Sequence, residues 1–564
     1  MKRTILALTF IALVACKASA QTDTTHFDLG RTQLKKEFTQ SITIKGADLE
    51  KQPFANLAEA INVWFYGTYI NKSSIVYVID GLVIKDVNAY SIHDIEEVTL
   101  VQNATAQLNG ALPTTQQMVL IKTKRHLGKS GILAAGKLSI AKLKPQYNID
   151  PYTNTFEKVS DESTTELYNN YTISAFKSLS KARFGLTADY LRDIVPSPGS
   201  ETFKYTIPHH FDRLRLNGYL NANLGSSSVI DIALNYTPQT SRQRYESISS
   251  NYNSESHNTE KLFNTSLNLS SKLTTGLYNT IHAGYSTVNA NIRYDVNQSI
   301  DSNPIFYNQS YKSGAHIFNI YDQLSYTEQL GSLTIESSLN LNYLHYKDTL
   351  AFTNINNGDA ATGDNTYKRT SWLLTPSISL SYHNLINLQG GMVYNLSSAK
   401  QLFAREGDEI KRIYPFVNFT VDLAHIVDEN SKTSLKVYTS YALSNNFGDV
   451  YTRLSDVSPN FENVSYTPIG YIYNLSGYSF SNFKTLSGGV TIDPFSKKLF
   501  VNYFFEKRNY PTAMLVNDPY YNSHLELYSA QAIMHTVSVM GLINQYNNLT
   551  WHAGLNATTI HQKI

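Results

Sequence analysis

The stretch "LRLNGYLNANLGSSSVIDIALNY" (214–236) alternates apolar and polar residues on both sides of a short turn. Leu214, Leu216 and Leu220 share one face of the first half, and Leu234 and Tyr236 continue the pattern in the second half. The opposite face is polar and rich in Asn. A period of two residues is that of a β-strand, and "GSSS" (225–228) has the composition of a turn. The stretch therefore predicts a β-hairpin with one apolar and one polar face.

The same pattern recurs along most of the chain, for example in "SLTIESSLNLNY" (332–343) and "KLFVNYFFEK" (498–507). We expect strands of about 10 residues, the length that a tilted strand needs to cross a bilayer. Polar stretches such as 242–258 and 354–369 predict long connections on one rim. The fold predicted for residues 127–564 is an all-β transmembrane barrel of roughly 16–22 antiparallel strands. A secreted β-rich repeat or sandwich protein is the alternative.

The composition excludes two other classes of protein. The 564 residues include 40 Tyr and 25 Phe, and only 16% are charged. Disordered chains have few aromatic residues and a high net charge, whereas the formal net charge here is +2. Nucleic-acid-binding proteins carry a basic stripe, which this sequence lacks, so no nucleic-acid partner is expected.

Residues 1–20 have the pattern of a secretory signal peptide. Lys2 and Arg3 precede an apolar run, and "ASA" (18–20) forms a cleavage site before Gln21. "LVAC" (13–16) offers an alternative, in which Cys16 is lipidated. The rest of the chain has no run of about 18 apolar residues, so we expect no transmembrane helix.

Residues 40–126 differ from the rest and predict a small α/β domain that lies inside the barrel lumen. "FANLAEAINVWFYG" (54–67) has helical spacing of apolar residues. "IVYVIDGLVIKD" (75–86) consists of two apolar runs around Asp80-Gly81, a strong signal for a tight hairpin. "DIEEVTLVQNATAQLNGA" (94–111) predicts a strand followed by a helical turn, and "QMVLIKTKR" (117–125) predicts another strand.

These segments resemble the plug domain of TonB-dependent outer-membrane receptors, and specifically the SusC/RagA-like branch typical of Bacteroidetes. The resemblance rests on the order and spacing of "ADLEKQPFANLAEAI", "VYVIDGLVI", "IHDIEEVTLVQNATAQLNG" and "VLIKTKR". It continues in the barrel through "FDRLRLNGYLNANLG" and "NNLTWHAGLNATT". The residues that carry the plug motif are Asp80, Gly81, Asp94, Ile95, Glu97, Asn109 and Gly110.

The resemblance implies a function as well as a fold. Members of this family hold the plug in a barrel of 22 strands and import nutrients, in this branch often oligosaccharides or peptides, across the outer membrane. The implied partners are the TonB–ExbB–ExbD complex, a SusD-like surface lipoprotein and outer-membrane lipid. No cofactor is implied.

The chain departs from the family pattern at three places. The segment 21–39 should lie in the periplasm, yet its "TTHFDLG" (24–30) is a degenerate TonB-contacting segment in which Phe27, Asp28 and Leu29 are the candidate contacts. "LNGALPTTQQM" (108–118) lacks the family's Arg and most of its glycines. The sequence also ends soon after the Trp-containing strand. These departures support two alternatives: a non-transporting docking barrel with a vestigial plug, and one part of a split receptor.

Catalytic motifs are absent from the sequence. There is no HExxH, GxSxG, Walker loop or paired-cysteine metal site. We therefore expect no enzymatic activity and no resident metal.

Overall fold

The computed structural model describes most of the chain between residues 26 and 563. The described residues are 26–28, 33–35, 41–52, 54–65, 75–84, 86–101, 117–126, 129–143, 147–149, 156–158, 164–195, 203–247, 252–300, 303–356, 359–396, 413–445, 482–494, 499–515, 526–546 and 549–563.

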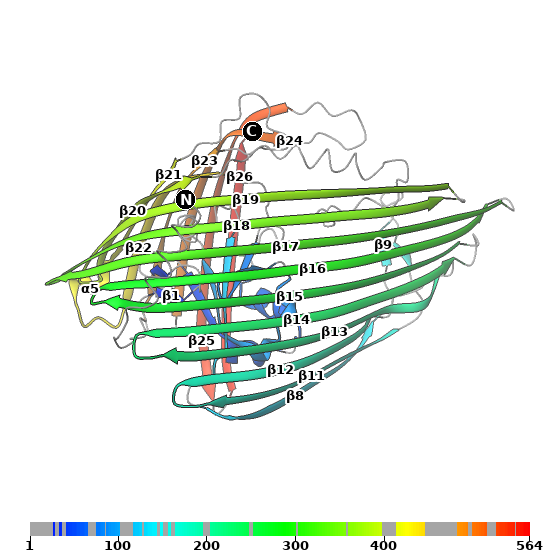
Figure 1. Ribbon diagram of the computed structural model, residues 1–564, viewed down its shortest axis with the longest axis horizontal. Helices are drawn as coiled ribbons and strands as arrows, with labels where there is room; N and C mark the ends of the chain where they lie inside the picture. Colours follow the sequence, from blue (N-terminus) through cyan, green and yellow to red (C-terminus); the bar gives the residue numbers. More distant parts are fainter. Residues whose placement is uncertain are drawn as a thin grey trace.

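A closed β-barrel makes up most of the molecule (Figure 1). It consists of β8 and the sixteen consecutive strands β11 to β26, so the predicted all-β barrel is confirmed. The barrel strands are β8 (Gly131–Leu143), β11 (Thr164–Ser178), β12 (Ala182–Val195), β13 (Phe203–Leu224), β14 (Ser228–Ser247), β15 (Tyr252–Thr274), β16 (Leu277–Ile300), β17 (Asn303–Leu330), β18 (Leu333–Asn356), β19 (Asp359–Tyr382), β20 (Ile386–Asn395), β21 (Ile413–Asp422), β22 (Ser434–Asn445), β23 (Asn482–Asp493), β24 (Leu499–Leu515), β25 (Glu526–Tyr546) and β26 (Leu549–Lys563).

The barrel closes where β26 meets β8. Every neighbouring pair from β8 through β11 to β26 is antiparallel. The number of strands is odd, and β8 and β26 therefore run in the same direction. Barrels of single bacterial chains have even numbers of strands, so this parallel closure is a departure from their usual pattern.

The two rims of the barrel differ in how they connect the strands. On one, which we call the short-turn rim, β13 and β14, β15 and β16, and β17 and β18 are joined by segments 225–227, 275–276 and 331–332. The short helix α5 (Leu423–Val427) lies on this rim between β21 and β22. The opposite rim, the long-connection rim, carries the longest connections of the chain, 396–412 and 446–481. Such asymmetry is typical of outer-membrane barrels.

Many strands are far longer than predicted. β15 to β19 have 23 to 28 residues and extend well past the rest of the wall toward the long-connection rim (Figure 1). The predicted long connections at 242–258 and 354–369 are wrong, because most of these residues belong to β14 and β15 or to β18 and β19. These polar segments form strands because the ladder of backbone hydrogen bonds does not require an apolar face where the wall lies in water.

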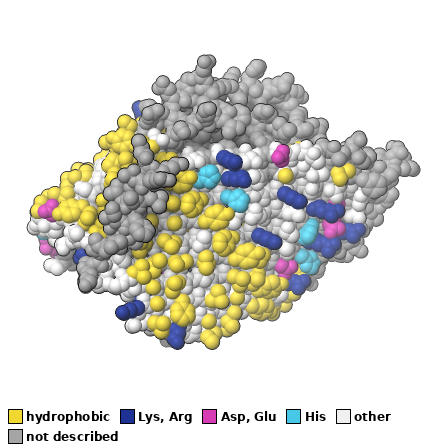
Figure 2. All heavy atoms as spheres, viewed as in Figure 1, with side chains coloured by type: hydrophobic (Ala, Val, Ile, Leu, Met, Phe, Trp, Pro, Cys, Tyr) yellow, Lys and Arg dark blue, Asp and Glu magenta, His cyan; other side chains and the backbone are white. Residues whose placement is uncertain are grey.

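The two faces of the wall follow the predicted alternation. Leu220, Leu224 and Leu234 point outward and are 39–49% exposed, whereas Arg215 and Asn235 point inward and are buried. Figure 2 shows the outward apolar side chains as a broad band over this wall, with Lys, Arg and His gathered toward the projecting ends of the strands. The polar face of the alternating sequence is therefore the luminal face.

In its described residues, the plug consists of a five-stranded mixed sheet and the helices α2 and α3, and it is located within the barrel (Figure 1). Its strand order is β3-β6-β7-β4-β5. None of the helices in the described part of the chain is long and apolar enough to cross a membrane. The plug elements are β3 (Ser41–Lys45), α2 (Gly46–Glu50), α3 (Leu57–Trp64), β4 (Ile75–Ile79), β5 (Leu82–Ile84), the 3-10 turns η3 (Val87–Ala89) and η4 (Ile92–Asp94), β6 (Ile95–Val101) and β7 (Gln117–Thr123).

The hairpin predicted around Asp80-Gly81 is confirmed. β4 and β5 pair antiparallel, and the two turn residues have φ angles of 46° and 85°. Both residues of a tight primed turn need positive φ, which Gly adopts freely and Asp tolerates. The hairpin is apolar because it lies in the plug core, where Leu82 and its neighbours are almost inaccessible.

The core of the plug continues into the barrel wall. Leu262 on β15 and Val288 on β16 belong to the same buried cluster as Leu82 and Ile84 of the hairpin. β5 contacts both of these wall strands. The plug therefore buries apolar surface against the wall on this side.

Gly284 on β16 permits this close approach. A Cβ built there would lie 2.8 Å from Leu82 Cδ1 and 2.7 Å from Asn319 Oδ1. We expect Gly284→Val to destabilise plug docking by about 1–3 kcal/mol through overpacking, measured as hydrogen exchange in β4 and β5. Gly136→Val on β8 is the control, because its Cβ would meet Tyr171 at an ordinary 3.7 Å. Equal protection in the two variants would contradict the prediction.

Candidate functional site

The plug is held to β12, β13 and β14 by two clusters of charged side chains. The first centres on Arg215 of β13, which has no exposed surface. Its guanidinium donates to Asp189 Oδ1 at 2.5 Å, to the Asn88 carbonyl at 2.7 Å and to Asn56 Oδ1 at 3.2 Å. One cation thus joins a carboxylate of the wall to two segments of the plug.

Arg213, two residues earlier on the same luminal face, makes a second connection to the plug. It donates to Asp86 Oδ2 at 3.2 Å, to the Asn88 carbonyl at 3.1 Å and to Gln239 Oε1 at 2.7 Å. Asn235 and Thr237 of β14 both donate to the Ala89 carbonyl, at 2.8 and 2.9 Å. The wall therefore supplies the hydrogen-bond donors for the buried carbonyls of η3, which no plug strand pairs.

Asp189 on β12 is the anionic counterpart of Arg215. Besides that arginine, its carboxylate accepts from Thr172 Oγ1 at 2.6 Å, Asn170 Nδ2 at 3.0 Å and Ser91 Oγ at 3.0 Å. Ser91 comes from the plug, where it also caps η4. A buried carboxylate is tolerated when it is paired and fully hydrogen-bonded, as this one is.

The second cluster joins the tip of the plug hairpin to β14. Arg125, which follows β7, donates to Asp80 Oδ2 at 3.1 Å and to both carboxylate oxygens of Asp231 at 2.7 and 2.8 Å. Asp80 also accepts from the Thr123 backbone amide at 3.0 Å. The guanidinium lies 5.3 Å from the centre of the Tyr219 ring. Arg125 therefore bridges a plug carboxylate and a barrel carboxylate.

Of the predicted plug-motif residues, Asp80, Gly81 and Asp94 lie at the interface between plug and wall. Asp80 and Gly81 form the hairpin turn, and Ile95 is fully buried in the plug core. Glu97 lies on β6 opposite Lys45 and Lys122, away from the two charged clusters. Asn109 and Gly110 lie outside the described residues.

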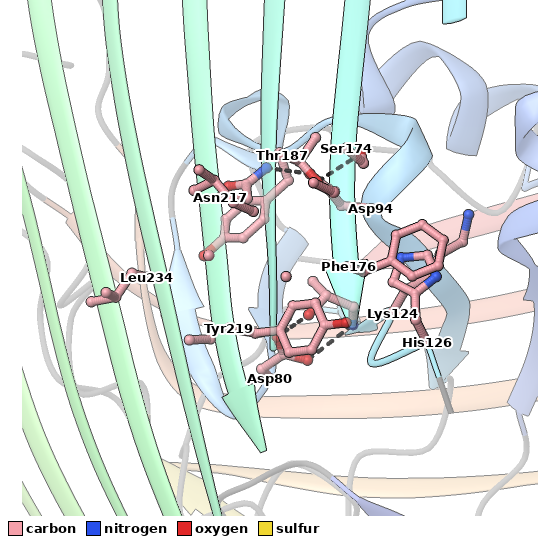
Figure 3. A pocket seen from close by; sticks show the side chains of 17 residues that line it. Asp80, Asp94, Lys124, His126, Ser174, Phe176, Thr187, Asn217, Tyr219 and Leu234 are labelled. Atoms are coloured by element: carbon pink, nitrogen blue, oxygen red, sulfur yellow. Dashed lines mark hydrogen bonds between the residues drawn. The ribbon is translucent and has the colours of Figure 1, made fainter. Parts of the chain in front are cut away.

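Asp94 is buried between the plug and the wall. It accepts hydrogen bonds from Asn217 of β13 and Thr187 of β12 (Figure 3). Burial raises the pKa of Asp94 to about 6, although these hydrogen bonds favour the ionised carboxylate. Of the candidate residues, Asp94 is thus the one suited to titrate near neutral pH.

Asp94→Asn is expected to remove a pH-dependent loss of stability. The pKa of Asp94 in the folded protein lies above its ordinary value of 3.8. At low pH the carboxyl is protonated in both the folded and the unfolded state, so it does not change the free energy of unfolding. As pH rises from about 4 to 6 the unfolded state ionises more readily, and the folded state loses up to roughly 3 kcal/mol of stability. The variant should therefore gain stability relative to wild type as pH rises, measured by denaturant unfolding from about pH 4 to 8. Asp48→Asn, on an exposed part of α2, is the control. A difference from wild type that does not vary with pH would contradict the prediction.

A small cavity of about 30 Å³ separates Asp94 from Asp80, which is space for a water molecule. Tyr90, Lys124, His126 and Tyr219 also line it (Figure 3). His126 stacks on Phe176 of β11 with 3.7 Å between ring centres. Burial, followed by the charges of Lys124 and Lys129, lowers the pKa of His126. The cavity is too small for a nutrient, so it belongs to the docking interface.

A larger pocket of about 450 Å³ lies near the long-connection rim. Its lining includes Arg244, Glu255, Arg293 and Asp295. Arg244 lies an even number of residues from Leu234 on β14, so both side chains are on the outward face of that strand. The register places Glu255 of β15 and Arg293 and Asp295 of β16 on the same face. The pocket is therefore on the outside of the wall and not in the lumen.

The candidate TonB-contacting residues precede the plug in the sequence and belong to neither charged cluster. Phe27 and Asp28 belong to β1 (His26–Asp28), which pairs antiparallel with β2 (Gln33–Lys35). Leu29 lies outside the described residues.

A second two-stranded sheet, β9 (Tyr147–Ile149) with β10 (Phe156–Lys158), follows β8. Within the described ranges, no group of three or more His, Cys, Asp or Glu side chains is arranged to hold a metal ion.

The sequence did not single out Arg125, Asp189, Arg213 or Arg215 as functional. One signal was available: Arg215 and Asp231 are charged residues on luminal faces that are otherwise mostly Asn, Ser and Thr. A charge on such a face needs a partner across the lumen. The position of that partner in the sequence was not readable.

Solved structures of outer-membrane receptors and transporters have the same fold. A chain of the RagAB peptide importer in its "open-open" state matches with a TM-score of 0.66 and 12% identity, over 97% of this chain and 74% of that chain. The siderophore receptor PiuA from Acinetobacter baumannii matches with a TM-score of 0.60 and 12% identity, over 97% and 82%. For the alcaligin receptor FauA from Bordetella pertussis the TM-score is 0.56 at 13% identity, over 97% and 86%.

At the level of sequence, no family model matches the chain, and no curated protein matches it. The structural likeness at 11–13% identity therefore concerns the fold. The chain has the plugged-barrel fold of these outer-membrane receptors and transporters.

Proposed function

We propose that this protein is a TonB-dependent outer-membrane receptor that imports a nutrient such as an oligosaccharide or a peptide. The observation that carries the proposal is the way the plug is held. Arg125, Arg213 and Arg215 connect it to the wall through hydrogen bonds and ion pairs. Polar contacts of this kind can be exchanged for hydrogen bonds with water, as a plug that moves during transport requires. The similarity in fold to a peptide importer supports the peptide class.

Each segment of the chain has its own location in this function. Residues 1–20 are the signal peptide, 21–39 the periplasmic segment, 40–126 the plug and 127–564 the barrel in the outer membrane. TonB–ExbB–ExbD engages Phe27, Asp28 and Leu29 from the periplasm by strand addition. A SusD-like surface lipoprotein covers the long-connection rim, as in the SusC/RagA-like branch. The protein is a transporter and not an enzyme.

Uptake by a deletion strain tests this proposal. The strain, carrying either the wild-type gene or a variant without residues 26–35, is supplied with labelled oligopeptides or oligosaccharides. We expect uptake with wild type, and uptake at the background level both with the variant and in a strain lacking TonB. Surface labelling of the barrel controls for export. Uptake of a cargo that persists without TonB, or equal growth with and without the gene on every cargo, would overturn the proposal.

A docking barrel with a vestigial plug is the second candidate. The observation that favours it is the β1–β2 pairing, in which Phe27 lies opposite Leu34. This pairing occupies one edge of the segment that strand addition would use. The candidate predicts a stable complex with another membrane protein and no binding of purified TonB to the chain. Co-purification from native membranes, followed by a TonB pull-down, discriminates the two functions.

A further inference from the structure

The outward face of β15 to β19 carries a row of neighbouring aromatic side chains, in which Tyr285 lies opposite Phe318 and Tyr343 opposite Trp372. Phe263, Tyr285, Phe318, Tyr343 and Trp372 come from five successive strands. The ring centres of Phe263 and Tyr285 are 6.4 Å apart, those of Phe318 and Tyr343 6.2 Å, and those of Tyr343 and Trp372 4.5 Å. Rows of this kind mark the level of lipid headgroups on membrane barrels. This aromatic row therefore locates the edge of the outer leaflet on this wall.

A row of basic side chains follows on the same face, toward the long-connection rim. We call Lys261, Lys312, Lys347 and Lys368 the basic row. Each lies two to six residues beyond the aromatic residue of its own strand, always on the side of the long-connection rim. Figure 2 shows Lys, Arg and His side chains along this side of the apolar band. The basic row is thus at the height where headgroups meet water.

Two lysines of the basic row repel one another. Lys347 lies directly opposite Lys368 in the ladder. Side chains at such positions have Cβ atoms about 5 Å apart, and like charges there are destabilising. An anion between them would remove the repulsion.

The acidic residues nearby on this face do not supply that anion. Glu255 pairs with Arg242 at 2.7 Å and Asp295 with Arg293 at 2.8 Å, both closer to the tips of the strands. Asp364 lies four residues from Lys368 on the outward face of β19 and forms no ion pair with the described lysines of the row. Among the described side chains, the lysines of the basic row form no ion pair. Lys261, Lys312 and Lys368 are exposed and available to a ligand.

We propose that the basic row binds the phosphate groups of a phosphorylated glycolipid of the outer leaflet, of the lipid A type. Its acyl chains would lie on the apolar band, its sugars against the aromatic row, and its phosphates between the lysines. The wall beyond continues outward for several residues of each strand, with the outward pocket at Arg244 and Arg293 above it. The inference rests on the outer-membrane location proposed above, but not on transport.

Binding of lipid A to the purified chain in phosphatidylcholine nanodiscs tests the inference. The variant is Lys312→Gln/Lys347→Gln/Lys368→Gln. Its control is Lys129→Gln/Lys177→Gln/Lys181→Gln, which removes the same charge at the short-turn rim. We expect the affinity for bisphosphorylated lipid A to fall about fivefold for each lysine, and hence about a hundredfold, in the first variant only. Native mass spectrometry counts the bound lipid, and the heat-dependent shift in gel mobility reports that each barrel is folded.

Three results would overturn the inference. They are equal binding by both triple variants, equal binding of dephosphorylated lipid A by wild type, and displacement of lipid A by inorganic phosphate alone, which would identify a site for free anions. Nutrient uptake measured on the same variants separates the two proposals. Loss of lipid A binding with uptake intact supports the basic row, and a wild type that imports nothing leaves the lipid result unaffected.

Discussion

Arg215→Met is expected to detach the plug from β12 and β13 while the barrel stays closed. The substitution leaves the Asp189 carboxylate buried without its cation, and breaking a buried pair from one side costs about 3–5 kcal/mol. It also removes the donors to Asn56 and to the Asn88 carbonyl, both in the plug. The measurement is hydrogen exchange, which should rise across β3 to β7 and remain low in β15 to β19.

Two further variants make this result specific. Arg242→Met removes an exposed arginine from β14 together with its surface ion pair, and exposed pairs contribute at most about 1 kcal/mol. Its plug should exchange as slowly as that of wild type. Arg215→Met/Asp189→Asn removes both charges and should recover much of the protection. Fast exchange in the barrel of Arg215→Met would show instead that Arg215 supports the wall.

The parts of the fold that local sequence specifies were predictable. The hairpin at Asp80-Gly81 depends on two adjacent residues with positive φ, so its position follows from twelve residues of sequence. The luminal position of Arg215 and Asn235 follows from the two-residue period of β13 and β14. The strand lengths were not predictable, because a wall that leaves the membrane has no apolar face to mark where it ends.

The contacts of the site could not be read from sequence because they join distant segments. Arg215 lies 127 residues from Asn88, and Arg125 lies 106 residues from Asp231. The period of two fixes the face on which a side chain lies but not its partner across the lumen. The closure of the barrel is the extreme case, since β26 reaches β8 from the other end of the chain.

Arg125→Met is expected to open an ion-conducting path at the second cluster. The change leaves Asp80 and Asp231, whose side chains are 8% and 17% exposed, close together without the cation between them. Their repulsion adds to the lost hydrogen bonds, and the cost to docking of the hairpin should again be about 3–5 kcal/mol. The measurement is conductance in planar bilayers, where wild type should be silent and the variant should show opening events.

The variants around Arg125 distinguish loss of charge from loss of shape. Arg125→Lys keeps the cation, but an ammonium cannot span two carboxylates as a planar guanidinium does, so we expect a weaker effect than with Met. Arg125→Met/Asp80→Asn/Asp231→Asn removes all three charges and should conduct less than Arg125→Met alone. A silent Arg125→Met would mean that the apolar contacts of Leu82 with β15 and β16 hold the hairpin in place by themselves. In that case the arginine bridge would position the hairpin without controlling the path through the barrel.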